Sequence, residues 1–261
     1  MILIEATSFR DLYININHFM LVAEETSSRY LIKSYSHQRV STNLIGSTLL
    51  GPKDIFPERL LPKVRETKWK NRYLPALKDM EQTKVLLNQL VQRRAFGSVC
   101  LPFTKPYVIK KHMSRGGQCL IAVQFNIAKG QYHSVNFFFR ASSIASTLMC
   151  DLVFLSRYII QDLIPYEKQH KIIYNFHFPY LFLRTIQLCE LSKLGVEWWH
   201  WKYISKEVKK SLVKIVLPLL KTNQLPNQKY KSTYRACTYW LKWFNSIDNI
   251  QRQDFLNWLE T

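Results

Sequence analysis

The chain has 261 residues, enough for one large domain or two small ones. Hydrophobic residues make up 47% and charged residues 21%, a globular balance that excludes a disordered or low-complexity chain. Lysine and arginine number 37 against 18 acidic residues. The resulting net charge of +19 favours an anionic partner such as a nucleotide, a nucleic acid or a membrane surface.

Targeting and cysteine patterns narrow the class of protein further. No apolar run reaches the roughly 18 residues of a membrane span, so the sequence predicts no transmembrane segment. The segment from Met1 to Glu5 lacks the basic region of a secretory signal, and we therefore expect a cytoplasmic protein. The five cysteines are widely spaced without a Cys-x-x-Cys pair, which predicts neither a disulfide framework nor a metal site.

Sequence patterns divide the chain into three stretches. Residues 1–75 mix short apolar runs with turn formers and show no long helical period. Residues 76–195 carry the clearest helix and strand patterns. Residues 196–261 are helical in character, basic and rich in tryptophan.

The middle stretch begins with a predicted helix and a predicted hairpin. Asp79 to Gln82 fits a capping box, in which Asp79 caps the helix and Gln82 bonds back, and Arg93-Arg94 ends the helix. An apolar run over 118–127 predicts a buried strand, and Lys129-Gly130 predicts the turn into a second strand over 131–140. Alternation gives that second strand two different faces. The partly polar face carries Ser134, Asn136, Phe138 and Arg140, and the apolar face carries Val135, Phe137 and Phe139.

A buried helix with one acidic residue is expected after the hairpin. Ser142 and Ser143 are good N-caps for an apolar helix from Ile144 to Ile160. Asp151 lies within it, and a buried carboxylate needs a partner, either a basic side chain or a ligand. Arg157 is a poor partner because six residues along a helix lie on nearly opposite faces.

Three of these segments, in this order, resemble the core of the thymidylate synthase superfamily. They are Thr83–Leu90 with Arg93-Arg94, the segment from Cys119 to Gln124-Phe125, and Arg140-Ala-Ser-Ser143; the five-residue spacing from the cysteine to Gln-Phe is the most specific. The resemblance covers about residues 79–180. It implies an α+β fold of the thymidylate synthase type, with a mixed sheet covered by helices, that dimerises through the sheet. Residues 76–195 are then the catalytic core, and 1–75 a divergent part of the same domain.

The resemblance also implies a reaction. In this family a cysteine thiolate, here Cys119, adds to C6 of a pyrimidine nucleotide, and C5 then attacks 5,10-methylenetetrahydrofolate. Positive charge from residues such as Arg115 would favour the thiolate. Arg140 matches the arginine that binds the substrate phosphate. Arg93 and Arg94 match a pair that the family donates to the same phosphate across a homodimer interface, although all three arginines are also compatible with ordinary surface positions.

Further matches concern the base and the sugar. Gln124 would lie next to the base. Asp151 falls where the family has asparagine in enzymes that act on uracil and aspartate in those that hydroxymethylate cytosine. Because a carboxyl group complements the amine and ring nitrogen of cytosine, we expect a cytidine monophosphate, CMP or dCMP. His177 and Tyr180 are candidates for the sugar-binding His-x-Tyr with one extra residue, and His177 is equally compatible with a core position.

Departures from the family pattern leave a second function open. Leu120 stands where many members have histidine, Arg140-Ala-Ser-Ser143 lacks the family's acid, and no counterpart is found for the active-site glutamate or the closing C-terminal segment. The first expectation is a C5 methyl- or hydroxymethyltransferase. The alternative is a diverged, catalytically weak homologue that binds nucleic acid or another polyanion through its basic surface.

The C-terminal stretch carries a separate signal. Lys202–Lys231 contains eight lysines and one acidic residue, and it follows Glu197-Trp-Trp-His-Trp201. Val208, Leu212, Ile215 and Leu219 have helical spacing, with Pro218 expected to break the helix. Basic and aromatic residues together favour single-stranded nucleic acid or a membrane surface. The plain alternative is a solvated lysine face over a tryptophan-rich core.

Overall fold

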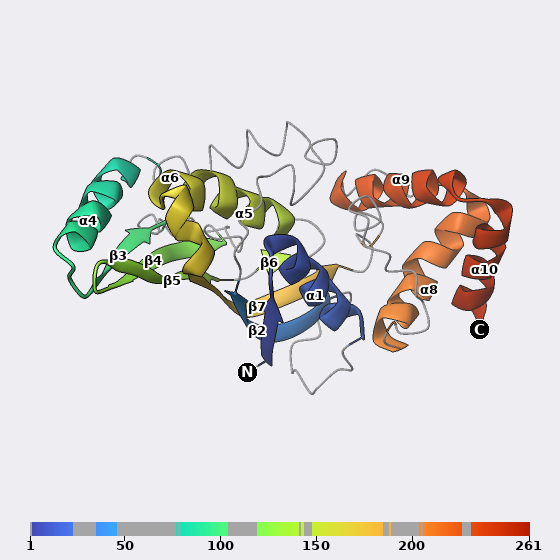
Figure 1. Cartoon of the computed structure of the whole chain (residues 1–261). Helices are drawn as coiled ribbons and strands as arrows, with labels where there is room; N and C mark the ends of the chain where they lie inside the picture. The colour runs from blue at the N-terminus through green and yellow to red at the C-terminus, as the bar shows by residue number, and fades with distance from the viewer. Residues whose placement is uncertain are drawn as a thin grey trace, which may run out of the picture. The chain divides into compact units, whose positions relative to one another are not determined.

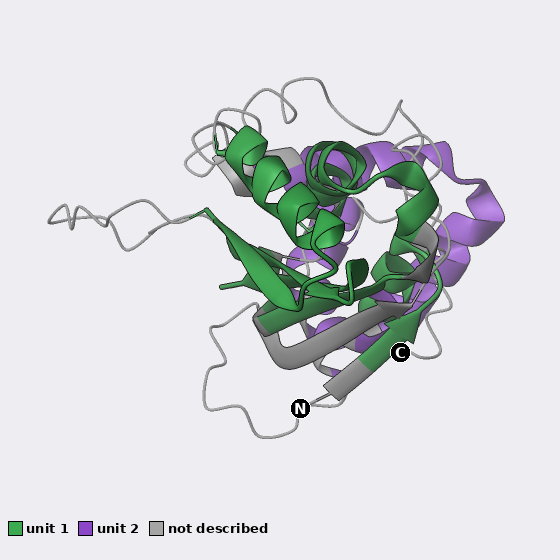
Figure 2. Cartoon of the chain, turned by 60° about the vertical axis from the view of Figure 1, so that its left-hand side comes forward, with its two compact units in different colours: residues 1–16, 39–142, 147–181 green, residues 17–38, 143–146, 182–261 purple. Residues whose placement is uncertain are grey.

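The computed structural model describes residues 2–22, 35–45, 77, 79–103, 119–140, 142–143, 148–184, 188, 204, 206–225 and 231–261. The chain forms two compact units (Figure 2). Unit 1 comprises Met1–Ile16, Arg39–Ser142 and Thr147–Leu181. Unit 2 comprises Asn17–Gln38, Ser143–Ser146 and Phe182–Thr261.

A mixed seven-stranded sheet organises the fold, which confirms the α+β class (Figure 1). Its order is β1-β2-β7-β5-β4-β3, with β6 paired to β7. The strands are β1 (Ile2–Ala6), β2 (Tyr35–Ile45), β3 (Gly97–Pro102), β4 (Leu120–Ala128), β5 (Gln131–Phe139), β6 (Ser142–Ser143) and β7 (Ile173–Arg184). β3, β4 and β5 are antiparallel neighbours, whereas the pairs β1–β2 and β5–β7 are parallel. The expected strands over 118–127 and 131–140 are confirmed as β4 and β5.

The helices of unit 1 lie against one face of this sheet (Figure 1). They are α1 (Phe9–Val22), which belongs to unit 1 as far as Ile16, α4 (Met80–Gln92), and the continuous run of α5 (Met149–Phe154), the π-helix Leu155–Ile160 and α6 (Gln161–Leu163). Phe9 of α1 packs edge-on against Phe176 of β7, and Phe154 of α5 packs edge-on against Phe103. The Tyr132 hydroxyl donates to the Leu163 carbonyl, which attaches α6 to the same face.

Strand register explains why this face forms the core. Val123 pairs with Phe137, and Phe137 with Phe176, so the apolar residues of three strands point to one side. The Phe137 and Phe176 rings stack at 4.7 Å and are fully buried. Phe139 and Phe178 repeat the arrangement at 4.5 Å. β4 is thus buried on one face and half-buried on the other, not buried on both as its apolar sequence suggested.

The expected capping box at the start of α4 does not form. Asp79 is the N-cap residue, but its side chain makes no capping bond. Its carbonyl accepts instead from the backbone N–H and the hydroxyl of Thr83, both at 3.0 Å. At the other end, the N–H groups of Arg94 and Ala95 bond to Val91 and Leu90, a Schellman closure that confirms the end expected at the arginine pair.

The helix expected over 144–160 begins later than its sequence suggested. Ser142 and Ser143 form β6 instead of an N-cap, and the helix starts at Met149 and runs to Leu163. Pairing of β6 with β7 occupies the serine backbone, which therefore cannot start a helix. Residues 144–147 lie outside the described part of the chain.

The first 75 residues contain a helix that the patterns did not indicate. Phe9, Leu12, Tyr13 and Ile16 of α1 are buried at spacings of three, four and seven. The alternating segment Tyr13-Ile-Asn-Ile-Asn17 hid this period, because β-branched residues at alternate positions favour a strand. Here the packing of Phe9 on β7 overrides that preference.

The described part of unit 2 contains the end of α1 from Asn17 and three further helices, α8 (Lys206–Thr222), α9 (Lys231–Ser246) and α10 (Asn249–Glu260). The apolar sides of α8, α9 and α10 pack on one another, with Leu212, Trp240 and Phe255 fully buried. Pro218 lies inside α8 and does not end it, contrary to expectation. Proline has no N–H to donate to the Lys214 carbonyl, and both residues are exposed, so this interruption of the helical bonding lies on the exposed side of α8. Within the described residues, no helix is long and apolar enough to cross a bilayer.

Candidate functional site

The predicted nucleophile and the predicted phosphate-binding arginine are adjacent at one end of the β4–β5 pair. The backbone N–H of Arg140 donates to the Cys119 carbonyl at 2.7 Å. Cys119 precedes β4 and is half-buried, while Arg140 follows β5 and is exposed. The antiparallel pairing of the two strands therefore determines this proximity, since the start of one strand meets the end of the next.

The predicted base-reading residue belongs to the same end of the sheet. Asp151 in α5 is only 5% exposed, and the Ser142 hydroxyl donates to its Oδ2 at 3.3 Å. Ser142 follows Arg140 by two residues. The sequence predicts a basic partner or a ligand for this carboxylate and a helix cap for Ser142; the structure instead joins the two residues by a hydrogen bond.

Gln124 lies on the sheet face opposite the helices, where strand alternation also places Arg140, but farther along the strands than this cluster. The Asn175 amide donates to Asn136 at 2.9 Å, and the Asn136 amide donates to Gln124 at 3.3 Å, forming a row across β7, β5 and β4. Five residues of strand separate Gln124 from Cys119, about 16 Å at the usual rise. The structure therefore does not bring Gln124 next to the predicted nucleophile within one chain.

His177 also belongs to this second face. Its ring stacks on Phe138 at 4.9 Å and is half-buried, and burial lowers its pKa. Tyr180 lies in the same strand, β7, with a side chain outside the described set. The described contacts of His177 are thus those of a residue packed on the sheet, as the plain alternative from the sequence allowed.

Arg93 and Arg94 lie at the opposite end of the hairpin from Cys119. The Lys129-Gly130 turn bonds to the segment after them, with the Gly130 N–H 3.3 Å from the Ala95 carbonyl. A nine-residue strand separates this end from Cys119, or about 30 Å. Both arginines are exposed and cannot reach the Cys119 of their own chain. Arg115 lies outside the described residues.

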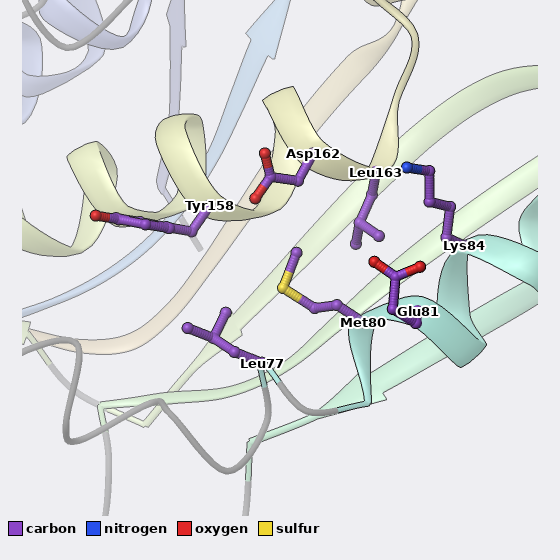
Figure 3. A pocket seen from close by; sticks show the side chains of 7 residues that line it. All are labelled: Leu77, Met80, Glu81, Lys84, Tyr158, Asp162 and Leu163. Atoms are coloured by element: carbon purple, nitrogen blue, oxygen red, sulfur yellow. The ribbon is translucent and has the colours of Figure 1, made fainter.

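A surface pocket of about 380 Å³ lies between α4 and the end of the α5–α6 run (Figure 3). Met80 and Leu163 form a buried apolar floor beneath the exposed side chains of Glu81, Lys84 and Asp162. The complete lining is Leu77, Met80, Glu81, Lys84, Tyr158, Asp162 and Leu163, and it contains none of the predicted site residues. The sequence patterns did not indicate this pocket. Its acidic and basic side chains come from two helices, and residue spacing along the sequence does not show that these helices are in contact.

Two acidic side chains and one basic side chain face one another in the pocket. Burial raises the pKa of Asp162, the nearby Lys84 ammonium opposes the rise, and Glu81 adds to it. Tyr158, which completes the rim, comes from the π-helix, a wide turn that is often found near functional sites. The described residues hold no group of three or more histidine, cysteine, aspartate or glutamate side chains arranged to bind a metal.

Comparison with known proteins assigns no family to this arrangement. No protein-family model matches the chain, and no curated protein is significantly similar to it.

Proposed function

We propose that this chain is a thymidylate synthase-like one-carbon transferase that modifies C5 of a pyrimidine nucleotide, a cytidine monophosphate in the first instance. The observation that carries the proposal is the bond between the Arg140 backbone and Cys119. It supports a site in which a guanidinium group and a thiol act on one ligand, the first on its phosphate and the second on its base.

The reaction at Cys119 needs one covalent addition. The sulfur bonds to C6, and the electron pair of the C5=C6 double bond moves to C5. C5 then takes up a proton or a one-carbon unit. Loss of the original C5 proton and expulsion of the thiolate restore the double bond. Exchange of the C5 proton with water therefore requires the nucleophile and the nucleotide alone.

Asp151 supports the choice of cytosine. A carboxylate accepts hydrogen bonds and donates none, so it can accept from the exocyclic amine of cytosine. The O4 carbonyl of uracil is itself an acceptor and would find no donor there. The Ser142 hydroxyl fixes one carboxylate oxygen from the side of Arg140. The proposal gives Asp151 the role of distinguishing the two bases.

The proposal includes a homodimer, because the role that it gives the two arginines needs a second copy. Arg93 and Arg94 can act on a nucleotide at Cys119 only if that nucleotide is bound by a second copy. The sheet face that carries Gln124, Asn136 and Asn175 supports such an assembly, because its described positions within β3, β4, β5 and β7 carry no lysine, arginine, aspartate or glutamate, and the exposed Arg140 directly after β5 lies at its margin. We call it the amide face. Interface centres are depleted of charge, and a chain of +19 needs an uncharged surface to associate with itself.

The backbone of Arg94 adds support for a functional role. Its φ is +50°, the left-handed conformation that favours glycine at this position after a helix. A side chain there costs about 1 kcal/mol relative to glycine. An arginine instead of a glycine at this position is what we expect if the guanidinium has a task, and Lys129 and Asn223 adopt the same φ at other turns.

The proposal names no described residues as the binding site of the one-carbon donor. β6 has Ser143 where the resemblance expects an acid, and β4 begins with Leu120 in place of the family's histidine. These residues do not fit the family's contacts to methylenetetrahydrofolate. The proposal therefore derives no step through the folate and uses it as an added reagent in the test.

Release of tritium from C5-labelled dCMP, CMP and dUMP, with and without methylenetetrahydrofolate, tests the enzyme. We expect release from a cytidine nucleotide, its loss in Cys119→Ser, and its retention in the matched control Cys100→Ser, whose thiol is exposed on β3. No release from any nucleotide contradicts the proposal. Release from dUMP alone contradicts the role of Asp151.

As a second candidate function, we propose that the basic surface of the chain binds nucleic acid. The observation that favours it is a row of exposed lysines on α8 in unit 2. This function is independent of Cys119 and does not compete with the first, because it uses residues of a different unit.

A further inference from the structure

The exposed face of α8 presents its charge in one stripe. Lys206, Lys210, Lys214 and Lys221 are all exposed. At 100° per residue they fall within an arc of about 80°, and at 1.5 Å per residue they extend over about 22 Å. We call these four residues the lysine stripe. Among the described residues Lys206 and Lys214 have no ion pair, whereas Lys221 pairs with Glu260 at 2.6 Å.

The apolar face of α8 is already occupied. Val208, Leu212, Val216 and Leu219 are buried against the other helices of unit 2. A helix that binds a bilayer surface needs its apolar face available for insertion between lipids. The lysine stripe therefore does not fit a membrane anchor, one of the two partners that the sequence suggested.

The described tryptophans of α9 and α10 pack on protein neighbours as well. Trp240 is fully buried and stacks parallel to Phe255, which also stacks on Trp258. Trp243 packs edge-on against both Trp240 and Phe255. The Lys209 ammonium lies 5.1 Å above the Trp258 ring. Binding of single strands without sequence preference relies on aromatic faces that stack with bases, and these rings have protein neighbours instead.

We propose that the lysine stripe of α8 binds the phosphate backbone of double-stranded nucleic acid, independently of sequence. This inference rests on the second proposed function and names its partner. The lysine stripe places four ammonium groups on one side of a helix, and the tryptophans of α9 and α10 that the structure describes pack on other rings, so we expect the stripe to recognise charge density. A duplex offers one phosphate charge per 1.7 Å of its axis, twice the density of one of its strands.

Fluorescence anisotropy with the full chain tests the inference, with a labelled random-sequence DNA duplex of 20 base pairs and its single strand as probes. The test variant is K206Q/K210Q/K214Q. The matched control is K129Q/K168Q/K242Q, which removes the same charge from exposed positions elsewhere. Circular dichroism of both variants verifies that they fold.

We expect tighter binding to the duplex than to the single strand at equal salt. Each phosphate contact contributes about 0.9 to the slope of log affinity against log salt, so the test variant should lower the duplex slope by about 2.7 and weaken binding tenfold or more near 0.1 M salt. The control should change the slope by less than about 1.

The contradicting outcomes distinguish failure of the duplex assignment on α8 from failure of nucleic-acid binding as a whole. Equal losses in both variants, or single-strand binding as tight as duplex binding, overturn the assignment to a duplex on α8 while nucleic-acid binding itself stands. No binding of either probe at 50 mM salt overturns the second proposed function. Preferential binding to vesicles of anionic lipid, lost in the test variant, assigns the stripe to membranes and contradicts the inference.

Discussion

The two faces of the β3–β4–β5–β7 sheet are made from alternate residues of the same strands, yet they differ in chemistry. On the helix-covered face, Phe137 stacks on Phe176 in a dry core. On the amide face, the neighbouring residues Asn136 and Asn175 bond to each other and remain half-buried. The first face is built for stability. The second keeps polar groups and avoids charge, which is the composition expected of a recognition surface.

The largest expected effect is on the core face. Phe137→Ala should lower the free energy of unfolding by about 3–5 kcal/mol, because it opens a cavity beneath Phe176. The neighbouring Phe138→Ala, on the half-buried amide face, should cost about 1.5 kcal/mol or less in the isolated chain. Urea unfolding followed by circular dichroism measures both. Equal losses would show that the two faces do not differ as described.

A charge at the centre of the amide face should disrupt the proposed dimer. Asn136→Lys places two like charges at the interface and breaks the amide row, so we expect dimer dissociation to rise about 100-fold or more. The control is Gln131→Lys at the exposed start of β5, which should leave association unchanged. Light scattering after size-exclusion chromatography gives the mass. A wild-type monomer at micromolar concentration would count against the dimer.

Substituting each arginine of the pair by glycine should change the free energy of unfolding in opposite directions. Arg94→Gly should raise the free energy of unfolding by about 0.5–1 kcal/mol, because glycine adopts the left-handed backbone without strain. Arg93→Gly should lower it by a similar amount, since Arg93 has a helical φ of −76°. Both changes should weaken nucleotide binding. Destabilisation by Arg94→Gly, measured by urea unfolding, would remove the strain argument for its role.

The smallest expected effect concerns pH. Burial lowers the pKa of His177 in the folded chain, so the unfolded chain takes up a proton first as the pH falls below about 6.5. Stability should therefore fall from pH 7 to pH 5.5, and His177→Gln should reduce that slope. The exposed His133→Gln is the control. Equal slopes in wild type and His177→Gln, from urea unfolding at several pH values, would contradict the assignment to His177.

Local patterns predicted the central hairpin and the ends of α4, because alternation and turn residues act over a few positions. The strand pair 118–140 is confirmed, and so is the separation of Phe137 from Asn136 onto different faces. The helix start at Ser142 was wrong because a long-range pairing with β7 competed with the local cap. The α1 helix was missed for the same reason, since packing on β7 outweighed its strand-like alternation.

For the candidate site, the sequence identified residue types better than their arrangement. The adjacency of Cys119 and Arg140 could be expected from a hairpin that starts after one and ends before the other. The bond between Ser142 and Asp151 could not, because it depends on where α5 packs. Nor did any spacing indicate that Gln124 would lie in the amide row, or that Met80 and Leu163 would form the floor of a pocket.

Subunit complementation is the most direct test of a site shared between two copies. Cys119→Ser and Arg93→Ala/Arg94→Ala should each be nearly inactive in C5-tritium release. After mixing and reassociation, half of the dimers are mixed and each holds one intact site, so about one quarter of the wild-type activity should return. Both variants inactive alone, with recovery on mixing, is the predicted result. No recovery despite confirmed exchange of subunits would contradict a site built from Cys119 of one copy and the arginine pair of the other.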